Sequence, residues 1–328
     1  MKKSVTKILF VRLFSSLVIL FLLISLIFVL IRIAPGDPVQ KYISPELSKE
    51  LAEKVRESFD LNGSVFNQYL SFVKNLFSGN FGISYNYRSP VIAVIKDYFL
   101  FTLAFSFICI SVQLVFSYIL AITAFKKKGS LIDKFLSRIS FVIYSIPSFI
   151  TAIILIYIFS LTLGLLPSSE LKSINFDELS MLEKIFDYFR HLILPVATLS
   201  LGGIVIFYKY LRDNFDSISK KSFVVYLRTI GQSENEILNK HIIPNALGPF
   251  ISVAGVELGM LLSGALITEV IFGLPGMGRL TVNAILLRDY PLVVGCTFVS
   301  GVLIVLSNLF ADLLKVKIDK RLVREILN

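Results

Sequence analysis

The sequence predicts an all-α integral membrane protein with six membrane-spanning helices. Of its 328 residues, 55% are apolar and only 17% are charged, whereas an average soluble domain has about 25% charged residues. The charges are clumped, which leaves uncharged stretches at 13–31, 98–125, 139–169, 191–208, 258–268 and 290–311. Most of these stretches reach or approach the ~20 residues that a helix needs to cross a bilayer. An ordinary soluble protein is therefore excluded.

Six spans are predicted, at residues 9–33, 99–125, 139–166, 191–208, 246–270 and 291–312. The first is preceded by lysines and must be weighed against a cleavable signal peptide. Its uncharged core is longer than the usual length of about 7–15 residues, and no small-x-small cleavage site follows it. We therefore expect a retained first span.

The positive charges predict that both termini are cytoplasmic. With the N-terminus inside, twenty Lys and Arg residues fall in the inner segments and thirteen in the outer ones, eight of them in the long outer loop that runs from Arg32 to Lys96. Long segments cross the membrane largely regardless of charge, so the short loops give the stronger signal. The net charge of +10 is thus a topology signal and does not indicate a nucleic-acid partner.

The chain is then divided into a first span (1–33), an extracytoplasmic helical segment (34–97), a transmembrane domain (98–312) with a cytoplasmic loop at 209–241, and a cytoplasmic tail (313–328). Ser44 and Pro45 predict a helix start in the outer segment. Apolar residues from Phe66 to Phe77 predict a second amphipathic helix there. We expect these helices to cover span ends, with docking of a partner as the alternative.

The loop 209–241 has helical signals of its own. Phe223, Leu227 and Ile230 recur at helical spacing, and Gly231 is the residue type that commonly ends a helix. Ser233 and Glu236 then match a capping box, in which each side chain accepts a hydrogen bond from the other residue's backbone. The pattern predicts two helices that meet at a corner. It fits either a helix lying on the inner lipid surface or a protrusion that a cytoplasmic partner grips.

The corner sequence FVVYLRTIGQSE at 223–234, followed by KHIIPNAL at 240–247, resembles the coupling segment of permease subunits of binding-protein-dependent ABC importers. It is most similar to the first permease of the peptide/nickel branch. Further similar stretches cover nearly the whole chain: RIAPGDP at 32–38, residues 79–84, LPVATL at 194–199, EVIFGLPGMGR at 269–279, residues 288–291, and the closing positions 308, 312 and 318–321.

The resemblance implies a type I ABC importer fold in the bacterial cytoplasmic membrane that imports peptides, nickel or metal chelates. Its implied partners are a homologous second permease, two ATP-binding subunits and an extracytoplasmic solute-binding protein. The sequence has no G-x-x-x-x-G-K-[ST] motif. We therefore expect no catalytic residue and no cofactor in this chain, with ATP used by the partner subunits. Two cysteines and two histidines, spread along the chain, also predict no metal site.

By the same resemblance, the residues that couple the chain to the ATPase are Tyr226, Leu227, Arg228, Gly231, Ser233, Glu234 and Glu236. Tyr226 and Leu227 depart from the family pattern, which usually has two small residues there. Arg228 and Glu234 are expected to be exposed charges that can pair with the ATPase.

The predicted translocation pathway comprises Glu257, Glu269, Pro275, Gly276 and Gly278. Glu257 occupies a position that is usually small or hydroxylic in the family. An intramembrane acid is a functional candidate because burying it unpaired is unfavourable. It could meet a cationic group of the substrate, or pair with a residue of the second permease.

Two other classes of protein remain as alternatives. An ion-coupled secondary transporter predicts several intramembrane charges, whereas only Glu257 lies well inside a predicted span. A membrane-embedded sensor predicts a cytoplasmic signalling module, for which the short tail leaves no room.

Overall fold

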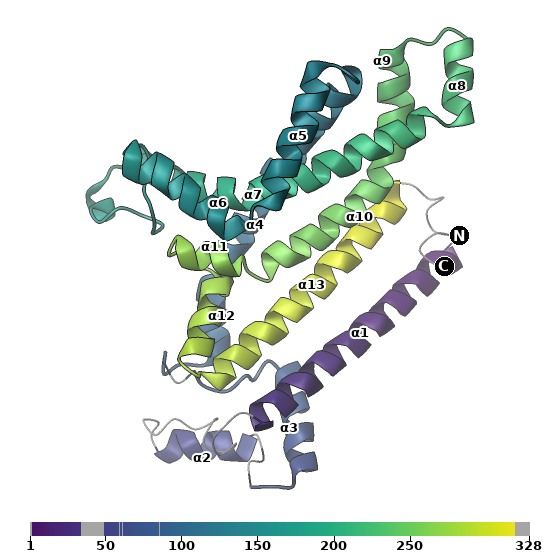
Figure 1. Cartoon of the computed structure of the whole chain (residues 1–328). Coiled ribbons are helices and arrows are strands. Elements are labelled where there is room, and N and C mark those ends of the chain that lie inside the picture. Colours follow the sequence, from purple (N-terminus) through teal and green to yellow (C-terminus); the bar gives the residue numbers. More distant parts are fainter. Residues whose placement is uncertain (1, 34–48, 59, 61, 85, 319–328) are drawn as a thin grey trace. The chain divides into compact units, whose positions relative to one another are not determined.

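The computed structural model describes residues 2–318, apart from 34–48, 59, 61 and 85. The predicted all-helical fold is confirmed: in the described residues, the only β-type pairing is one isolated bridge between Ile83 and Pro90. The helices, shown in Figure 1, are α1 (Lys2–Ile33), α2 (Lys49–Ser58), α3 (Val65–Phe77), α4 (Val91–Lys126), α5 (Leu131–Ser145), α6 (Ser148–Leu155), α7 (Met181–Ser219), α8 (Ser222–Thr229), α9 (Glu234–Ile237), α10 (Ile243–Leu262), α11 (Leu266–Ile271), α12 (Met277–Leu286) and α13 (Tyr290–Ile318). Two π-helical turns, η1 (Ile156–Thr162) and η3 (Leu238–Ile242), and the 3₁₀ turn η2 (Phe176–Glu178) link some of them.

All six predicted spans coincide with helical segments. In the described residues, four helical segments are long and apolar enough to cross a membrane: 91–126, 181–219, 234–271 and 290–314. The bent pair of α5 with α6 and η1 would make a fifth span, and α1 contributes a shorter apolar stretch, Phe14–Leu30. A six-span count stays a prediction, because four helical segments of the described residues are long and apolar enough to cross a membrane, or five if the bent pair is one span.

The third predicted span, 139–166, is not one straight helix. Its two halves, 131–145 and 148–162, are bent by 102° at a short break. Pro147 follows Ile146, whose backbone is extended at φ −91° and ψ 121°. A proline disfavours helical geometry in the residue before it, which explains why the helix ends there.

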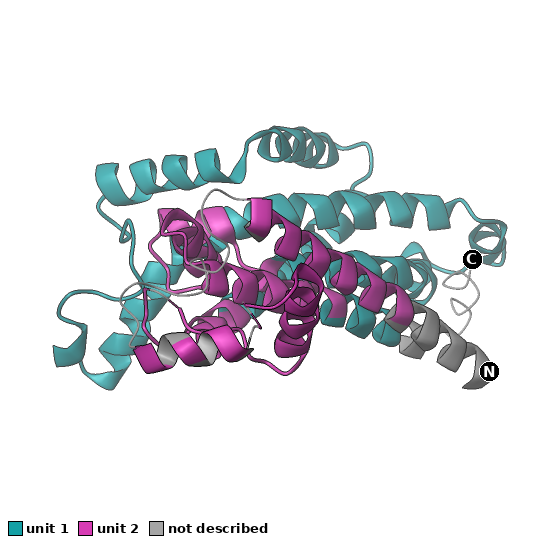
Figure 2. Cartoon of the chain, turned by 90° about the horizontal axis from the view of Figure 1, so that it is seen from below, with its two compact units in different colours: residues 1–9, 105–260, 306–328 teal, residues 10–104, 261–305 magenta. Residues whose placement is uncertain are grey.

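The chain forms two compact units, coloured separately in Figure 2. Unit 1 comprises residues 1–9, 105–260 and 306–328, and unit 2 comprises residues 10–104 and 261–305. The corner segment and Glu257 therefore belong to unit 1, whereas Glu269 and the loop with Pro275 belong to unit 2. The sequential division that the sequence predicts stays a prediction.

Unit 2 is built around a core where residues distant in the sequence pack together. Buried members include Ile24 and Phe28 of α1, Phe72 of α3, Val91 of α4 and Leu280 of α12. The predicted helix at 66–77 is confirmed as α3, and its Gln68 accepts a hydrogen bond of 2.6 Å from Arg32 at the end of α1. The predicted start at Ser44 and Pro45 lies outside the described residues.

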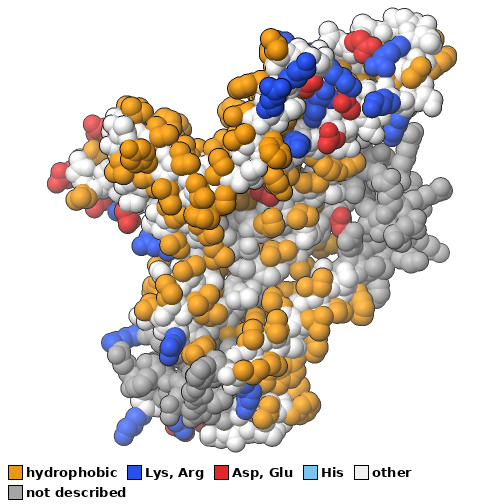
Figure 3. All heavy atoms as spheres, viewed as in Figure 1, with side chains coloured by type: hydrophobic (Ala, Val, Ile, Leu, Met, Phe, Trp, Pro, Cys, Tyr) orange, Lys and Arg blue, Asp and Glu red, His pale blue; other side chains and the backbone are white. Residues whose placement is uncertain are grey.

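Unit 1 has α7 at its centre. Phe207, Leu211 and Phe215 of this helix are buried, and the ring of Phe207 packs edge-on against Phe250 of α10 at 5.3 Å between centroids. Helix α7 begins ten residues before the predicted fourth span and continues to Ser219. In Figure 3, blue Lys and Arg side chains gather at the end of unit 1 that carries α8 and α9.

Candidate functional site

The corner segment, residues 222–237, has the two-helix geometry that the sequence predicts. Helix α8 ends at Thr229, and Gly231 adopts φ +83°, the left-handed region that side chains disfavour. The Gly231 N–H donates to the Arg228 carbonyl and the Gln232 N–H to the Leu227 carbonyl, each at 3.1 Å. This pair of bonds is the Schellman motif, which satisfies carbonyls at a helix end. Figure 1 shows α8 and α9 as the two arms of the corner.

One half of the predicted capping box is confirmed and the other half is wrong. The Ser233 Oγ accepts a hydrogen bond from the Glu236 N–H at 3.3 Å. The Glu236 carboxylate does not return to the Ser233 backbone; it accepts a bond of 2.6 Å from Lys240. Lys240 lies one turn further along the same helical face, where an opposite charge attracts the carboxylate more strongly than a neutral N–H does.

Arg228 and Glu234 pair with each other across the corner. The Arg228 Nε and Nη2 atoms donate to the two Glu234 oxygens at 2.6 and 3.1 Å, and its Nη1 donates to the Ser219 carbonyl at 3.1 Å. The hydrogen bonds from Arg228 hold the pKa of Glu234 below its usual value. The pair is therefore ionised at neutral pH and ties α8 to both the end of α7 and the start of α9.

One face of α8 is apolar and exposed. Phe223, Tyr226 and Ile230 are 40%, 63% and 54% exposed, whereas Val224 is fully buried. On the other arm, Ile237 and Ile242 are buried completely. Helix α9 passes through η3 into α10 without an intervening loop. The corner is thus fixed to unit 1 on its inner side and presents an apolar stripe on its outer side.

Glu269 lies in unit 2 and is fully buried, with hydrogen bonds from its own unit on both oxygens. Oε2 accepts from the Gly278 and Arg279 N–H groups at 2.6 and 3.0 Å. Oε1 accepts from Thr102 Oγ1 and the Ala265 N–H, each at 3.3 Å. The Thr102 hydroxyl also accepts from the Met277 N–H at 2.8 Å. Glu269 therefore caps the start of α12, where a negative charge is favourable.

The glycines near Pro275 let this carboxylate approach the backbone. A Cβ on Gly276 would lie 2.3 Å from the Glu269 Cδ, and one on Gly278 would lie 2.7 Å from the Leu266 Cα. Any larger residue would displace the carboxylate or α11. Glycine at positions 276 and 278 is therefore explained by the close packing of α11 on α12. The sequence alone does not reveal this packing.

Glu257 lies in α10 and is half-buried. Gln113 in α4 is a further polar residue of unit 1, which sequence reasoning missed. Gln113 is fully buried, and its Nε2 donates to the Leu199 carbonyl of α7 at 3.3 Å. A polar amide inside a predicted span was the signal that could have identified it.

Asp289 in unit 2 is an acid that sequence reasoning missed as a candidate. It is fully buried, and its Oδ2 accepts from the Ser84 hydroxyl at 2.5 Å and from the Asn86 N–H at 3.1 Å. Asp289 belongs to a stretch that carries the family resemblance, but only the fold brings it to residues 84–86.

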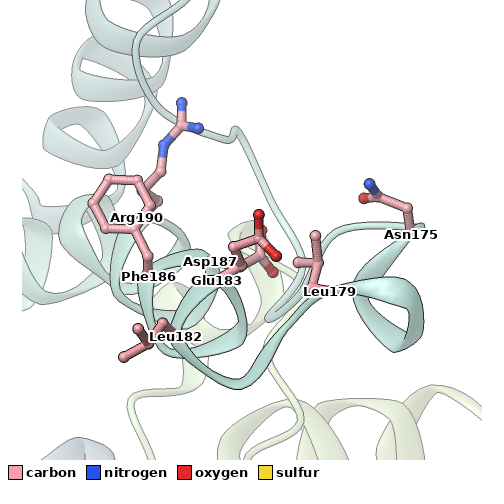
Figure 4. Close-up of a pocket in the computed structure, with 7 residues that line it drawn as sticks. All are labelled: Asn175, Leu179, Leu182, Glu183, Phe186, Asp187 and Arg190. Carbon is pink, nitrogen blue, oxygen red and sulfur yellow. The ribbon is translucent and has the colours of Figure 1, made fainter.

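A cavity of about 440 Å³ is lined by Asn175, Leu179, Leu182, Glu183, Phe186, Asp187 and Arg190 (Figure 4). Its charged groups already have partners. Glu183 accepts from the Ser180 N–H at 2.8 Å, Asp187 from the Ser173 N–H at 2.9 Å, and Arg190 donates to the Leu165 carbonyl at 2.7 Å. These contacts shape the segment before α7. In the described residues, no group of three or more His, Cys, Asp or Glu side chains could hold a metal ion.

Comparisons with known proteins place the chain in a family. Residues 113–324 match a family model described as "Binding-protein-dependent transport system inner membrane component". Residues 5–106 match the N-terminal model of the same transport systems. The curated relatives include the oligopeptide transport system permease protein AppB of Bacillus subtilis, 32% identical over 95% of this chain and 97% of the relative. They also include the nickel import system permease protein NikB of Staphylococcus aureus, 31% identical over 94% of this chain and 90% of the relative.

Two solved structures share the fold. The MetNI methionine ABC transporter in an inward-facing conformation matches with a TM-score of 0.51 and 17% identity, covering 72% of this chain and 97% of that chain. An amino acid ABC transporter crystallised with histidines matches with a TM-score of 0.53 and 16% identity, covering 76% and 97%. The chain belongs to the family of binding-protein-dependent transport system inner membrane components: it is a multi-pass permease of an ABC importer in the cell membrane, a transport component whose ATP is used by partner subunits.

Proposed function

We propose that this chain, together with a homologous second permease and two ATP-binding subunits, imports peptides or nickel and metal chelates. The proposal is supported by the names of its curated relatives, which are permeases for oligopeptides and for nickel. The substrate reaches the pair of permeases from an extracytoplasmic solute-binding protein. The chain spans the membrane six times, with both termini in the cytoplasm.

The single observation that carries the mechanism is the geometry of the corner segment. An apolar stripe on α8, made of Phe223, Tyr226 and Ile230, is exposed on a corner that is otherwise packed and hydrogen-bonded to unit 1. An exposed apolar patch with a polar rim is typical of a protein interface. We infer that this stripe docks in the ATP-binding subunit, with Leu227, Gly231 and Ser233 shaping the corner.

A movement of the corner segment is transmitted to α10 because the helices of the corner are connected to one another. The Arg228–Glu234 pair joins α8 to α9, and α9 continues into α10. Movement of α8 by the nucleotide cycle of the partner therefore tilts α10 and carries Glu257 with it. Arg228 and Glu234 act within the corner in this mechanism, and Glu236 does so through Lys240.

We further propose that Glu257 lines the translocation pathway. The turn before α12, with Pro275, Gly276 and Gly278, forms a wall at its outer mouth. Glu269 holds the shape of that wall through its bonds to the start of α12. During alternating access, the turn before α12 would then move with its conformation unchanged.

The proposal is tested by purifying the chain with a C-terminal tag and identifying its companions by mass spectrometry. The purified complex is then placed in liposomes with the binding protein. We expect ATP-binding subunits to co-purify, and uptake to require ATP and the binding protein. Uptake by the purified chain alone, driven by an ion gradient, would contradict the proposal and favour a secondary transporter.

A further inference from the structure

A cavity of about 390 Å³ in unit 2 lies between the start of α4 and the turn before α12. We term it the tyrosine–aspartate pocket, and the residues that line it are Tyr87, Ser89, Val94, Asp97, Tyr98 and Pro275. All six belong to unit 2. Pro275 is part of the turn that we propose as a wall of the outer mouth. The pocket therefore lies beside the proposed route of the solute.

Asp97 gives the pocket a negative charge. The lining contains this one carboxylate and no Lys or Arg. The Asp97 side chain is exposed, and within the described parts of the chain no ion pair or hydrogen bond reaches it. The neighbouring Lys96 lines a separate, apolar cavity between α4 and α13. The charge of Asp97 is therefore left for a ligand to balance.

Tyr87 and Tyr98 form a hydrogen-bonded aromatic pair in the lining. Their hydroxyl oxygens lie 3.0 Å apart, and their rings pack edge to face with 6.2 Å between the centroids. The bond between the two hydroxyl groups uses one of their two hydrogens, so one hydrogen is left while both oxygens can still accept. The face of a tyrosine ring also attracts cations. Together with Asp97, the pair makes the lining rich in acceptors.

Buried polar contacts hold the segment before α4 in place. The hydroxyl of the fully buried Ser84 donates to Asp289 at 2.5 Å and accepts from the Tyr87 N–H at 3.2 Å. The Ser84 N–H donates to the Ser89 carbonyl at 3.0 Å. Tyr87 and Ser89 thus lie on a closed turn, and Asp97 lies on a helix. A pocket ordered in advance binds a ligand at a lower entropic cost.

We propose that the tyrosine–aspartate pocket binds an ammonium group of the solute, such as the free N-terminus of a peptide, before the solute enters the translocation pathway. An ammonium has three N–H donors and no acceptor, which suits a carboxylate beside hydroxyl oxygens and aromatic rings. A transition metal ion fits less well, because a metal such as zinc usually has at least three protein ligands. In the described residues, no group of three or more His, Cys, Asp or Glu side chains could hold one. This inference rests on the proposed import function and selects peptides from its substrate classes.

The experiment measures how a thiol in the pocket reacts with charged reagents. Ser89→Cys places the thiol in the lining, and the native Cys109 and Cys296 are fully buried. The reagents are two methanethiosulfonates of similar size, one with a trimethylammonium group and one with a sulfonate group. The complete importer is labelled, and the mass of this chain is followed with time. The measured quantity is the ratio of the cationic to the anionic labelling rate.

Ser78→Cys is the reference, because Ser78 is exposed in the same unit but does not line the pocket. We expect the ratio at Ser89→Cys to be about tenfold higher or more, since one carboxylate attracts one reagent and repels the other. Adding Asp97→Asn should lower the ratio to the reference value, whereas Asp97→Glu keeps the charge and should retain most of it. The matched control Glu57→Gln removes an exposed acid of α2 outside the pocket and should leave the ratio unchanged. An equal ratio at Ser89→Cys and Ser78→Cys would overturn the inference.

Competition identifies the occupant of the pocket. Tri-alanine should slow the cationic labelling at Ser89→Cys, whereas N-acetyl-tri-alanine at the same concentration should not, because it lacks the ammonium group. Slowing by both peptides, or by neither, would contradict the proposal. Slowing by the unloaded binding protein, with none by free tri-alanine, would assign the pocket to a side chain of that protein and would also contradict it.

A second measurement decides the question if Ser89→Cys does not assemble. In proteoliposomes with the binding protein, ATP-driven uptake of tri-alanine should fall about tenfold in Asp97→Asn and stay near the wild-type rate in Asp97→Glu and Glu57→Gln. Unchanged uptake by an assembled Asp97→Asn importer, or uptake of nickel chloride but not of tri-alanine by the wild type, would refute the inference. Absence of ATP-driven uptake of both probes would instead contradict the proposed function, because the labelling ratio does not depend on transport.

Discussion

Gly231 is the position where the coupling proposal can be tested most sharply. Its φ is +83°, and a Cβ added there would meet nothing within 4 Å. Replacement of Gly231 therefore costs only backbone strain, about 1–2 kcal/mol for a side chain in the left-handed region. A protein is typically stable by about 5–15 kcal/mol, so Gly231→Ala and Gly231→Asp should both fold and insert.

The two variants should differ in coupling. The alanine methyl group adds little to the proposed interface, and we expect a loss of a few fold in solute imported per ATP hydrolysed. The aspartate would place an unpaired charge where the apolar stripe docks, and burying one costs about 3–5 kcal/mol. At 1.36 kcal/mol for each factor of ten, the ratio of uptake to hydrolysis should fall at least tenfold.

The assay measures ATP hydrolysis and solute uptake in the same proteoliposomes, after size-exclusion chromatography has shown normal assembly. Gly129→Asp is the matched control, because Gly129 has φ +79° and also meets nothing within 4 Å, but lies outside the corner segment and outside the predicted spans. Full coupling in assembled Gly231→Asp would refute the reasoning. Equal loss in Gly129→Asp would show that strain alone is responsible.

Three further predictions concern packing and buried acids. Gly278→Ala should lower the unfolding free energy by about 1–3 kcal/mol through overpacking, because its Cβ would lie 2.7 Å from the Leu266 Cα. The measurement is thermal unfolding of the purified complex with Gly202→Ala as the control, and equal unfolding midpoints for the two variants would contradict the prediction. Asp289→Ala leaves the buried Ser84 hydroxyl and the Asn86 N–H without their acceptor, so it should cost about 1–3 kcal/mol or more; an unchanged melting temperature would count against this. Gly255→Ala should reduce the yield of monodisperse protein, since its Cβ would lie 2.0 Å from the Ala311 Cβ. The second change Ala311→Gly should restore the yield, and failure of this rescue would show that the contact does not limit the yield.

The corner segment shows which structural features the local sequence can predict. Gly231 and Ser233 carry short-range signals, because a left-handed residue and a helix cap depend on a few neighbouring backbone groups. Both signals were confirmed in the structure. The Glu236 side chain was assigned wrongly, since its choice between a backbone N–H and Lys240 depends on which partner carries a charge and shares its helical face.

The sequence by itself determined the helical membrane character, the positions of the hydrophobic segments and the corner, because hydrophobic length and helix-ending residues are local properties. Only the tertiary structure decided that Glu269 caps α12, that Asp289 meets Ser84, and that Gln113 packs against Gly203. The physical reason is that a buried polar group must find donors and acceptors wherever the fold brings them. Those partners are up to 205 residues apart in the chain.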